Sequence, residues 1–148
     1  TRFLIFSLVI FIVGVGLYVD SNFNRVKPFE SASSQVKQPT LQEQSATIGE
    51  VKYIITPKNI NSDIRTWDFE IILDTHTGSL DQDLVSIIRI VDNKGIEYQA
   101  NKWVGDPPGG HHREGILEFL PITPYPTYIE LKIQTTDTTK ETTFRWNI

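Results

Sequence analysis

The chain has 148 residues, contains no cysteine and carries a formal net charge of −4. The absence of cysteine excludes disulfide bonds, thiolate metal sites, iron–sulfur clusters and a cysteine nucleophile. Residues 46–148 carry a net charge of −5, against +1 for residues 1–45, and this acidic part lacks the clustered Lys and Arg that phosphate contacts require. We therefore expect no nucleic-acid partner, and the length suits one domain of ordinary size.

Residues 3–19 form an uncharged run of aliphatic and Phe side chains, interrupted only by one serine, two glycines and one tyrosine. A helix of this length spans roughly 25 Å, close to the hydrocarbon thickness of a bilayer. We expect a single transmembrane anchor over residues 1–19, in contact with membrane lipid. A cleaved signal peptide is the alternative, but the run exceeds the usual apolar core of about 7 to 15 residues and the preceding basic region is limited to Arg2.

The charges on either side of the apolar run set its expected orientation. Arg2 and the α-amino group precede the run, whereas the four charged residues of segment 20–30 cancel one another. Positive charge near a membrane span favours the cytoplasmic side. We therefore expect a C-terminal domain outside the cytoplasm, in the periplasm or at the cell surface.

Residues 20–46 are rich in Ser, Gln and Asn and are interrupted by Pro28 and Pro39. Such a composition predicts an extended linker that becomes ordered only on a partner. We therefore expect other protein subunits to bind through the anchor and the linker. A pilin-like filament subunit is a further alternative, although Ile5 stands where bacterial type IV pilins usually place Glu and Pro28 interrupts a long helix.

From Thr47 onward apolar and polar residues alternate with the period of two that is typical of half-buried strands. A first strand around Val51–Ile55 is expected to end at Pro57, and a second covers residues 67–74. The apolar run 84–91 predicts a central strand. It is followed by a hairpin turn at residues 92–95, where Gly95 supplies positive φ, and by a return strand over residues 96–103.

The last part of the chain repeats this pattern. Residues 116–120 predict a short strand ended by prolines, and residues 129–133 and 144–148 predict a hairpin. About seven strands with no amphipathic helix indicate an all-β, immunoglobulin-like antiparallel β-sandwich over residues 47–148. We expect its core to contain Trp67, Phe69, Ile71, Phe119, Leu131, Phe144 and Trp146.

Two of the three histidines, His111 and His112, occur in the Pro- and Gly-rich loop 103–115, and His76 follows a predicted strand. Three imidazoles with nearby carboxylates predict a Cu or Zn site if the two loops meet at one end of the sandwich. Adjacent residues of a strand point to opposite faces, however. The alternative is therefore that one imidazole packs on Trp103 or bonds to loop carbonyls while the other is solvated.

The sequence contains no motif for catalysis. No Gly-x-Ser-x-Gly nucleophile elbow occurs, and Asp81-Gln82-Asp83 lacks the Gly and Glu of a calcium loop, so these carboxylates are expected to form a solvated edge. Residues 121–128 are stiffened by three prolines and carry two tyrosines, which suits either a partner-binding segment or an ordinary crossing between strands.

These features together predict a non-catalytic accessory or structural subunit of a membrane-associated protein assembly. A membrane-tethered Cu- or Zn-binding protein that uses His76, His111 and His112 is the alternative. We do not expect an enzyme, and no cofactor other than such a metal ion is indicated.

Overall fold

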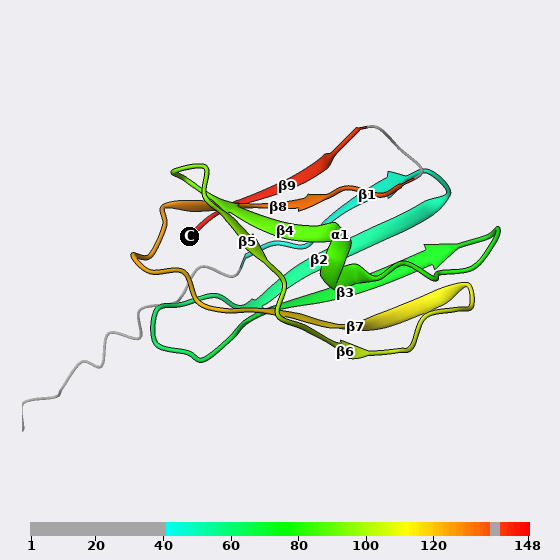
Figure 1. Cartoon of the computed structure of the whole chain (residues 1–148), viewed down its shortest axis with the longest axis horizontal. Helices are drawn as coiled ribbons and strands as arrows, with labels where there is room; N and C mark the ends of the chain where they lie inside the picture. The colour runs from blue at the N-terminus through cyan, green and yellow to red at the C-terminus, as the bar shows by residue number, and fades with distance from the viewer. Residues whose placement is uncertain (1–40, 137–139) are drawn as a thin grey trace, which may run out of the picture. The chain divides into compact units, whose positions relative to one another are not determined.

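The computed structural model describes residues 41–136 and 140–148, and these residues form two antiparallel β-sheets (Figure 1). The first sheet has the strand order β1-β2-β3-β7-β6, and the second has the order β5-β4-β8-β9. The prediction of an all-β sandwich is confirmed. The described residues hold nine strands rather than about seven.

The strands of the first sheet are β1 (Gln44–Ile48), β2 (Val51–Asn59), β3 (Trp67–Thr75), β6 (Lys102–Gly105) and β7 (His112–Phe119). Those of the second are β4 (Ile88–Asp92), β5 (Glu97–Gln99), β8 (Tyr128–Ile133) and β9 (Thr142–Asn147). A single helical turn, α1 (Leu84–Ile87), precedes β4. The predicted hairpins β4–β5 and β8–β9 are present, with Gly95 at a φ of 81° in the first turn.

The core lies between the two sheets and is made by the alternating residues of each strand. In β3, every second residue from Trp67 to Thr75 is buried. The Phe69 ring lies 5.6 Å from the Phe119 ring and 6.0 Å from the Trp146 ring, centroid to centroid, and so joins the two sheets. All of the predicted core residues are buried, namely Trp67, Phe69, Ile71, Phe119, Leu131, Phe144 and Trp146.

The expected central strand over residues 84–91 is wrong in its first half. Residues 84–87 form α1, and the Asp83 side chain caps its N-terminus by accepting a hydrogen bond from the Val85 amide at 3.1 Å. An Asp at this position satisfies a helix-terminal N–H that would otherwise lack a partner. A short apolar run suits a buried helical turn as well as a strand, so periodicity alone did not distinguish them.

The expected return strand over residues 96–103 is also wrong as a single strand. The segment divides into β5, which pairs with β4, and β6, which pairs with β7 in the other sheet. The chain crosses between the sheets at Ala100 and Asn101, where the Asn101 amide donates to Glu118 O at 2.7 Å. Ala100 is buried in the core at this crossing.

Two strand limits differ from the sequence-based prediction. Strand β2 does not end at Pro57 but continues to Asn59 through an irregularity in its pairing with β3. Pro57 is tolerated there because the pairing of β1 with β2 stops at Ile55, so no ladder bond to β1 is required of the proline. Strand β7 begins at His112, earlier than the expected start at Ile116.

Strand β1 lies partly within the segment predicted as a linker. It begins at Gln44, three residues before the expected start of the sandwich at Thr47. Trp146 Nε1 donates to Gln42 O at 2.7 Å, and Gln44 Nε2 donates to Arg145 O at 2.7 Å. The segment from residue 42 onward is thus tied to β9.

The predicted anchor over residues 1–19 and most of the predicted linker lie outside the described residues. Within residues 41–136 and 140–148, no helix has the length and apolar character needed to cross a membrane.

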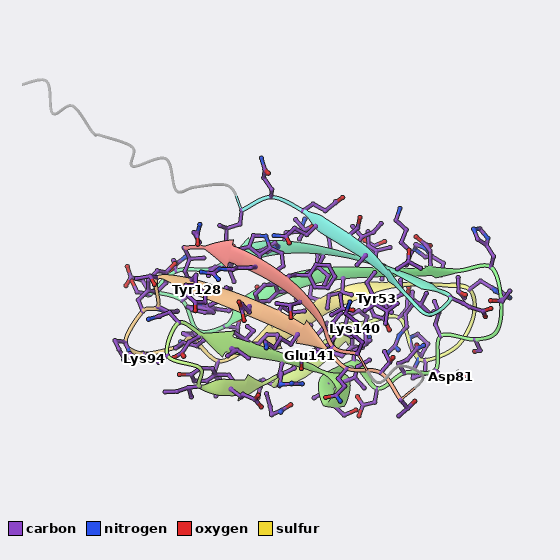
Figure 2. All side chains as sticks on the ribbon, turned by 90° about the horizontal axis from the view of Figure 1, so that it is seen from above. Tyr53, Asp81, Lys94, Tyr128, Lys140 and Glu141 are labelled. Carbon is purple, nitrogen blue, oxygen red and sulfur yellow. The ribbon has the colours of Figure 1, made fainter. Side chains whose placement is uncertain are left out.

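The loops of the sandwich gather at two opposite ends. We call the end formed by residues 49–50, 76–83 and 106–111 the pocket end. We call the end formed by residues 60–66, 93–96 and 120–127 the proline end. Figure 2 shows that the two ends are on opposite sides of the domain. Asp81 lies at the pocket end, and Lys94 and Tyr128 lie at or beside the proline end.

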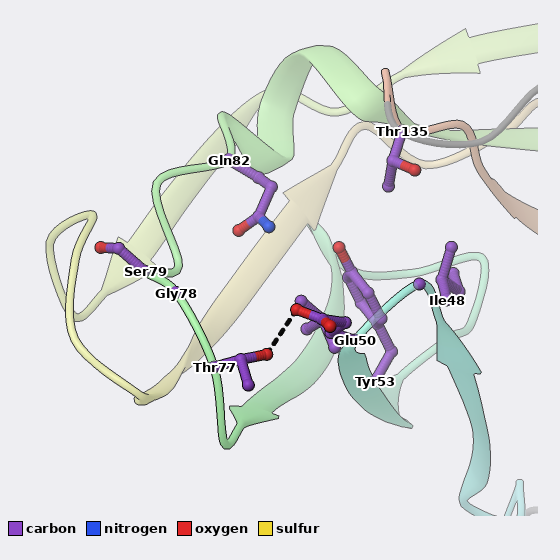
Figure 3. Close-up of a pocket in the computed structure, with 10 residues that line it drawn as sticks. Ile48, Glu50, Tyr53, Thr77, Gly78, Ser79, Gln82 and Thr135 are labelled. Carbon is purple, nitrogen blue, oxygen red and sulfur yellow. Dashed lines mark hydrogen bonds between the residues drawn. The ribbon is translucent and has the colours of Figure 1, made fainter.

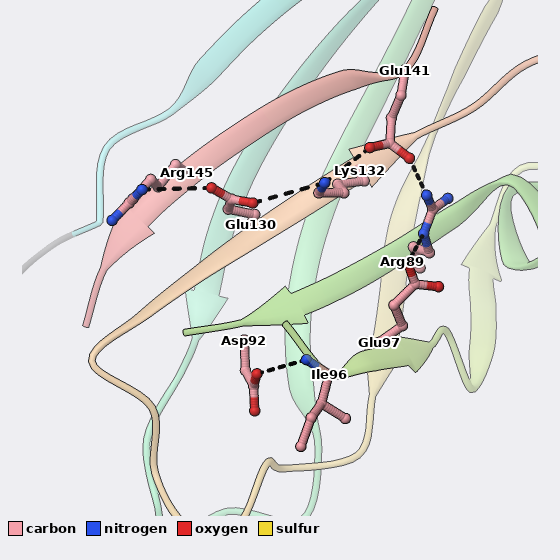
Figure 4. Close-up of polar contacts among 8 residues, drawn as sticks. All are labelled: Arg89, Asp92, Ile96, Glu97, Glu130, Lys132, Glu141 and Arg145. Atoms are coloured by element: carbon pink, nitrogen blue, oxygen red, sulfur yellow. Dashed lines mark hydrogen bonds and ion pairs between the residues drawn. The ribbon is translucent and has the colours of Figure 1, made fainter. Parts of the chain in front are cut away.

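The solvent face of the second sheet carries a continuous series of ion pairs (Figure 4). It runs across four strands and their flanks in the order Arg145, Glu130, Lys132, Glu141, Arg89 and Glu97. The two ends of this series, Arg145 and Glu97, are exposed, whereas the four side chains between them are partly buried. Each charge has a partner of opposite sign, which offsets the cost of partial burial.

Candidate functional site

A pocket of about 330 Å³ opens at the pocket end of the sandwich (Figure 3). Its walls come from the β1–β2 turn, from the loop between β3 and α1, and from Thr135 after β8. The turn contributes Glu50, flanked by the apolar Ile48 and Val51, and the loop contributes Thr77 and Gln82. This volume is at the lower end of the range of about 300–1,000 Å³ that ligand pockets occupy.

Buried Thr75 holds the two principal walls of the pocket together. Its single hydroxyl proton can be donated to Glu50 O, which lies 3.0 Å from Oγ1, or to Thr77 O, which lies 2.7 Å from it, so that Oγ1 bridges the turn and the loop. The Thr77 hydroxyl in turn donates to Glu50 Oε2. The carboxylate of Glu50 is therefore held at the pocket by contacts across the two walls.

Arg113 of β7 is bonded to the loop between β3 and α1. Its side chain is buried, with 3 % exposed, and Nη1 donates to Gln82 O at 2.7 Å and to Leu80 O at 3.5 Å. Nε donates to Asp106 O at 3.1 Å. Burial lowers the pKa of the guanidinium, whereas the charge of Asp106 and those of the other nearby carboxylates act to raise it. Arg113 thus links two loops of the pocket end through their carbonyls.

The two strands of the β6–β7 hairpin, which lies beside Arg113, approach each other closely at a pair of glycines. The guanidinium of Arg113 lies 5.1 Å from the centroid of the Trp103 ring, and Trp103 Nε1 donates to Asp106 O at 2.9 Å. Gly105 and Gly115 are paired across the hairpin. A Cβ added to Gly115 would lie 2.6 Å from Gly105 Cα and 2.6 Å from Trp103 Cζ2. Glycine is therefore required at this position by the indole and the facing backbone.

The two histidine-containing loops do meet at the pocket end. The Thr75 amide donates to His111 O at 2.9 Å, and the Leu80 amide donates to Gly110 O at 3.1 Å. These contacts join the backbones of the loops. The hypothesis of a three-histidine site required these two loops to meet at one end of the sandwich, and their main chains do so.

The imidazoles themselves are arranged differently. His112 Nδ1 lies 2.7 Å from Asp74 Oδ1, and Nε2 lies 3.8 Å from Glu114 Oε2, on the solvent face of β3 and β7. The hydrogen bond to Asp74 raises the pKa of His112, and the negative charges around it act in the same direction, whereas partial desolvation lowers it. His76 and His111 are exposed.

Across the described ranges 41–136 and 140–148, no three or more His, Cys, Asp or Glu side chains are grouped closely enough to hold a metal ion. Binding of Cu or Zn by His76, His111 and His112 stays a prediction from the sequence.

Sequence reasoning missed the residues that build the pocket. Arg113 had a local signal, since it shares the core-facing register of Leu117 and Phe119 in β7. Glu50 and Gln82 had none, because they are brought together by the packing of loops distant in the chain.

The proline end has a different character. Tyr125 donates its hydroxyl to Ile60 O at 3.1 Å, and its ring packs edge-on against Trp67 at 5.8 Å. The Thr127 amide donates to Asn93 Oδ1 at 3.2 Å. The three loops of this end are thus bound to one another.

The β4–β5 turn of the proline end is organised by the buried Asp92. Its Oδ1 accepts from the Lys94 amide at 2.8 Å and the Ile96 amide at 2.9 Å, and its Oδ2 accepts from the Tyr98 hydroxyl at 3.1 Å. Burial raises the pKa of Asp92, but the hydrogen bonds from Ile96, Lys94 and Tyr98 outweigh this effect, and the pKa is lowered overall.

Four large apolar side chains are exposed among the described residues, and three of them lie at the proline end: Ile96, Leu120 and Tyr125. Leu120 is the most exposed, at 64 %. The fourth, Val104, lies on β6.

The chain matches no model of a known protein family, no curated protein and no solved structure.

Proposed function

We propose that the chain is a non-catalytic accessory or structural subunit of a membrane-associated protein assembly. In this proposal the apolar segment 3–19 is the membrane anchor, and the β-sandwich stands outside the cytoplasm. The anchor and the linker make the main contacts with the other subunits. The proline end of the sandwich makes a further contact with a protein partner.

We also infer that the sandwich is of the immunoglobulin type with one added N-terminal strand. The order β2-β3-β7-β6 corresponds to strands A-B-E-D of such domains, and β5-β4-β8-β9 corresponds to C′-C-F-G. Strand β1 then adds to the outer edge of strand A. Immunoglobulin-type sandwiches carry binding surfaces at their loop ends, which agrees with the proposal, although the fold alone does not determine a function.

The observation that carries the proposal is the exposure of Leu120, Ile96 and Tyr125 on loops fixed by hydrogen bonds. A surface that is ordered before binding loses less conformational entropy when a partner binds. Aromatic side chains are enriched in protein interfaces, and tyrosine combines an apolar ring with a hydroxyl. The proline end meets these conditions within the described residues.

Native sizing of the full chain, extracted from its membrane in a mild detergent, tests the proposal. We expect a complex clearly larger than one chain of 16.9 kDa in its micelle. Leu120→Asp places a charge at the exposed contact and should release the sandwich from the complex or destabilise the complex. Val104→Asp is the matched control, because Val104 is also an exposed aliphatic residue but lies on β6.

Recovery of a lone wild-type chain would contradict the proposal. Equal effects of Leu120→Asp and Val104→Asp would remove the specific role of the proline end. Both variants alter exposed side chains, so both should fold, and circular dichroism of the purified proteins verifies this.

A further inference from the structure

We propose that the pocket beside Glu50 binds the ammonium group of a primary amine. This group belongs either to a free small molecule or to the lysine side chain of another protein. The proposal concerns the pocket end and does not rest on the function proposed above, so either can fail without the other.

The charge of the lining favours a cation. Among the described residues that line the pocket, Glu50 carries the one carboxylate, Tyr53 adds a phenol, and none is Lys, Arg or His. Asp81 and Asp83 lie in the adjoining loop and add negative potential. Arg113, the cation bonded to this loop, is already bonded to the carbonyls of Leu80, Gln82 and Asp106. Glu50 takes part in no ion pair among the described residues. An entering cation would therefore meet an uncompensated carboxylate.

Among the residues that the structure describes, the pocket also contains a buried hydrogen-bond acceptor that has no donor. Within the described part of the chain, the Gln82 side-chain oxygen Oε1 is buried and has no hydrogen-bond partner. Figure 3 shows the Gln82 side chain directed from the loop toward the space beside Thr77 and Glu50. Because the terminal amide torsion of Gln is broad, a modest rotation turns this oxygen toward a donor in the pocket. An ammonium group, with three donors and no acceptor, fits this arrangement.

The carboxylate of Glu50 is held in place by neighbouring hydrogen bonds. Thr75 joins the turn to the loop through the carbonyls of Glu50 and Thr77, and the Thr77 hydroxyl bonds one oxygen of the Glu50 carboxylate. The other carboxylate oxygen is left to accept from a ligand. The apolar Ile48 and Val51 complete the wall and suit the methylene groups that lead to an amine.

The test is an NMR titration of the ¹⁵N-labelled full chain in a non-ionic detergent. n-Butylammonium is the free-amine probe, with 1-butanol and butyrate as neutral and anionic controls. A tripeptide with a central lysine, blocked at both ends, is the side-chain probe, and the same peptide with norleucine is its control. For a group this small we expect a dissociation constant of about 1 to 10 mM, with shifts centred on the amides of Glu50, Thr77 and Gly78.

Glu50→Gln keeps the shape of the side chain and removes its charge, so affinity should fall about tenfold because charged hydrogen bonds are the stronger ones. Glu118→Gln on β7, away from the pocket, is the matched control and should bind like the wild type. If the NMR spectrum of Glu50→Gln loses its dispersion, that variant is unfolded. Gln82→Met is then tested in its place and should weaken binding severalfold.

Binding of n-butylammonium alone would identify a small amine as the ligand, and tighter binding of the lysine peptide would identify a protein side chain. Equal shifts with 1-butanol, unchanged affinity in both pocket variants, or no saturable shift from either cationic probe up to about 50 mM would overturn the proposal.

Discussion

The two ends of the sandwich are built from similar lengths of loop but are stabilised in different ways. At the pocket end a buried cation, Arg113, binds the carbonyls of two loops and leaves a polar pocket with a carboxylate at its wall. At the proline end a buried anion, Asp92, binds the amides of a turn, and apolar side chains remain exposed beside it. One scaffold thus presents a polar cavity at one end and exposed apolar side chains on hydrogen-bonded loops at the other.

The largest expected difference is between two arginines that each lie over an aromatic ring. Arg113 lies over Trp103 and is buried, whereas Arg145 lies 3.6 Å from the Tyr128 ring centroid with 53 % of its side chain exposed. Arg113→Met should lower the free energy of unfolding by about 3 kcal/mol, because buried carbonyls lose a charged donor. Arg145→Met should cost less than about 1 kcal/mol.

Urea unfolding of the full chain, followed by tryptophan fluorescence, measures both values. Similar losses for the two variants would show that Arg113 does not organise the pocket end.

A second pair of variants compares two glycines. Gly115→Ala places a Cβ against the facing backbone and the Trp103 ring, so we expect a loss of about 1–3 kcal/mol from overpacking. Gly95 in the proline-end turn has a φ of +81° and open space around it. Gly95→Ala should therefore cost only the backbone strain of about 1 kcal/mol.

Thermal unfolding of both variants gives the comparison. A smaller effect at Gly115 than at Gly95 would mean that the hairpin relaxes easily and that its close approach is not a structural requirement.

His112 at the start of β7 and Asp92 beside the proline end should respond to pH in opposite directions. The pKa of His112 is raised above its ordinary value of 6.5, so its interaction with Asp74 stabilises the fold fully below that value and is lost as pH rises through the raised pKa. The pKa of Asp92 is lowered below its ordinary value of 3.8. Its contribution is present above that value and is lost as pH falls through the lowered pKa.

Unfolding free energies measured as a function of pH separate these effects when Asp74→Asn and Asp92→Asn are compared with the wild type. Asp74→Asn should remove the decline near and above neutrality, and Asp92→Asn should flatten the decline in acid. If the decline in unfolding free energy near neutrality persists in Asp74→Asn, the decline belongs to a group other than His112.

The smallest expected effect concerns metal ions. Because His112 alone of the three histidines contacts carboxylates in the described residues, we expect Cu(II) or Zn(II) to raise the melting temperature by less than about 2 °C. A larger rise that is lost when His76, His111 and His112 are replaced together would establish the metal site that the sequence predicts.

The parts of the fold that follow from local pattern were predictable. Alternation revealed β3, β8 and β9 and the core built on Trp67 and Phe69, because burial of one strand face acts on every second residue. The helical turn at Leu84 was missed because a short apolar run suits two structures. The division of residues 96–103 between two sheets was missed because it depends on which neighbours each half finds, and these lie far away in the chain.

The candidate site was less predictable for the same reason. The sequence predicted a site at His76, His111 and His112, and the two loops that contain these residues do meet. The pocket beside them depends on Glu50 and Gln82, which are common surface residues in unremarkable sequence. Glu50 and Gln82 line one pocket because the β1–β2 turn approaches the loop after β3, and no local sequence pattern predicts this approach.

Site-specific photo-crosslinking in the native membrane tests the central claim most directly. A photoreactive phenylalanine analogue is placed either at position 125 at the proline end or at position 104 on β6. We expect one discrete crosslinked protein species from position 125 and none from position 104. No crosslink at position 125, or the same product from positions 125 and 104, would contradict it.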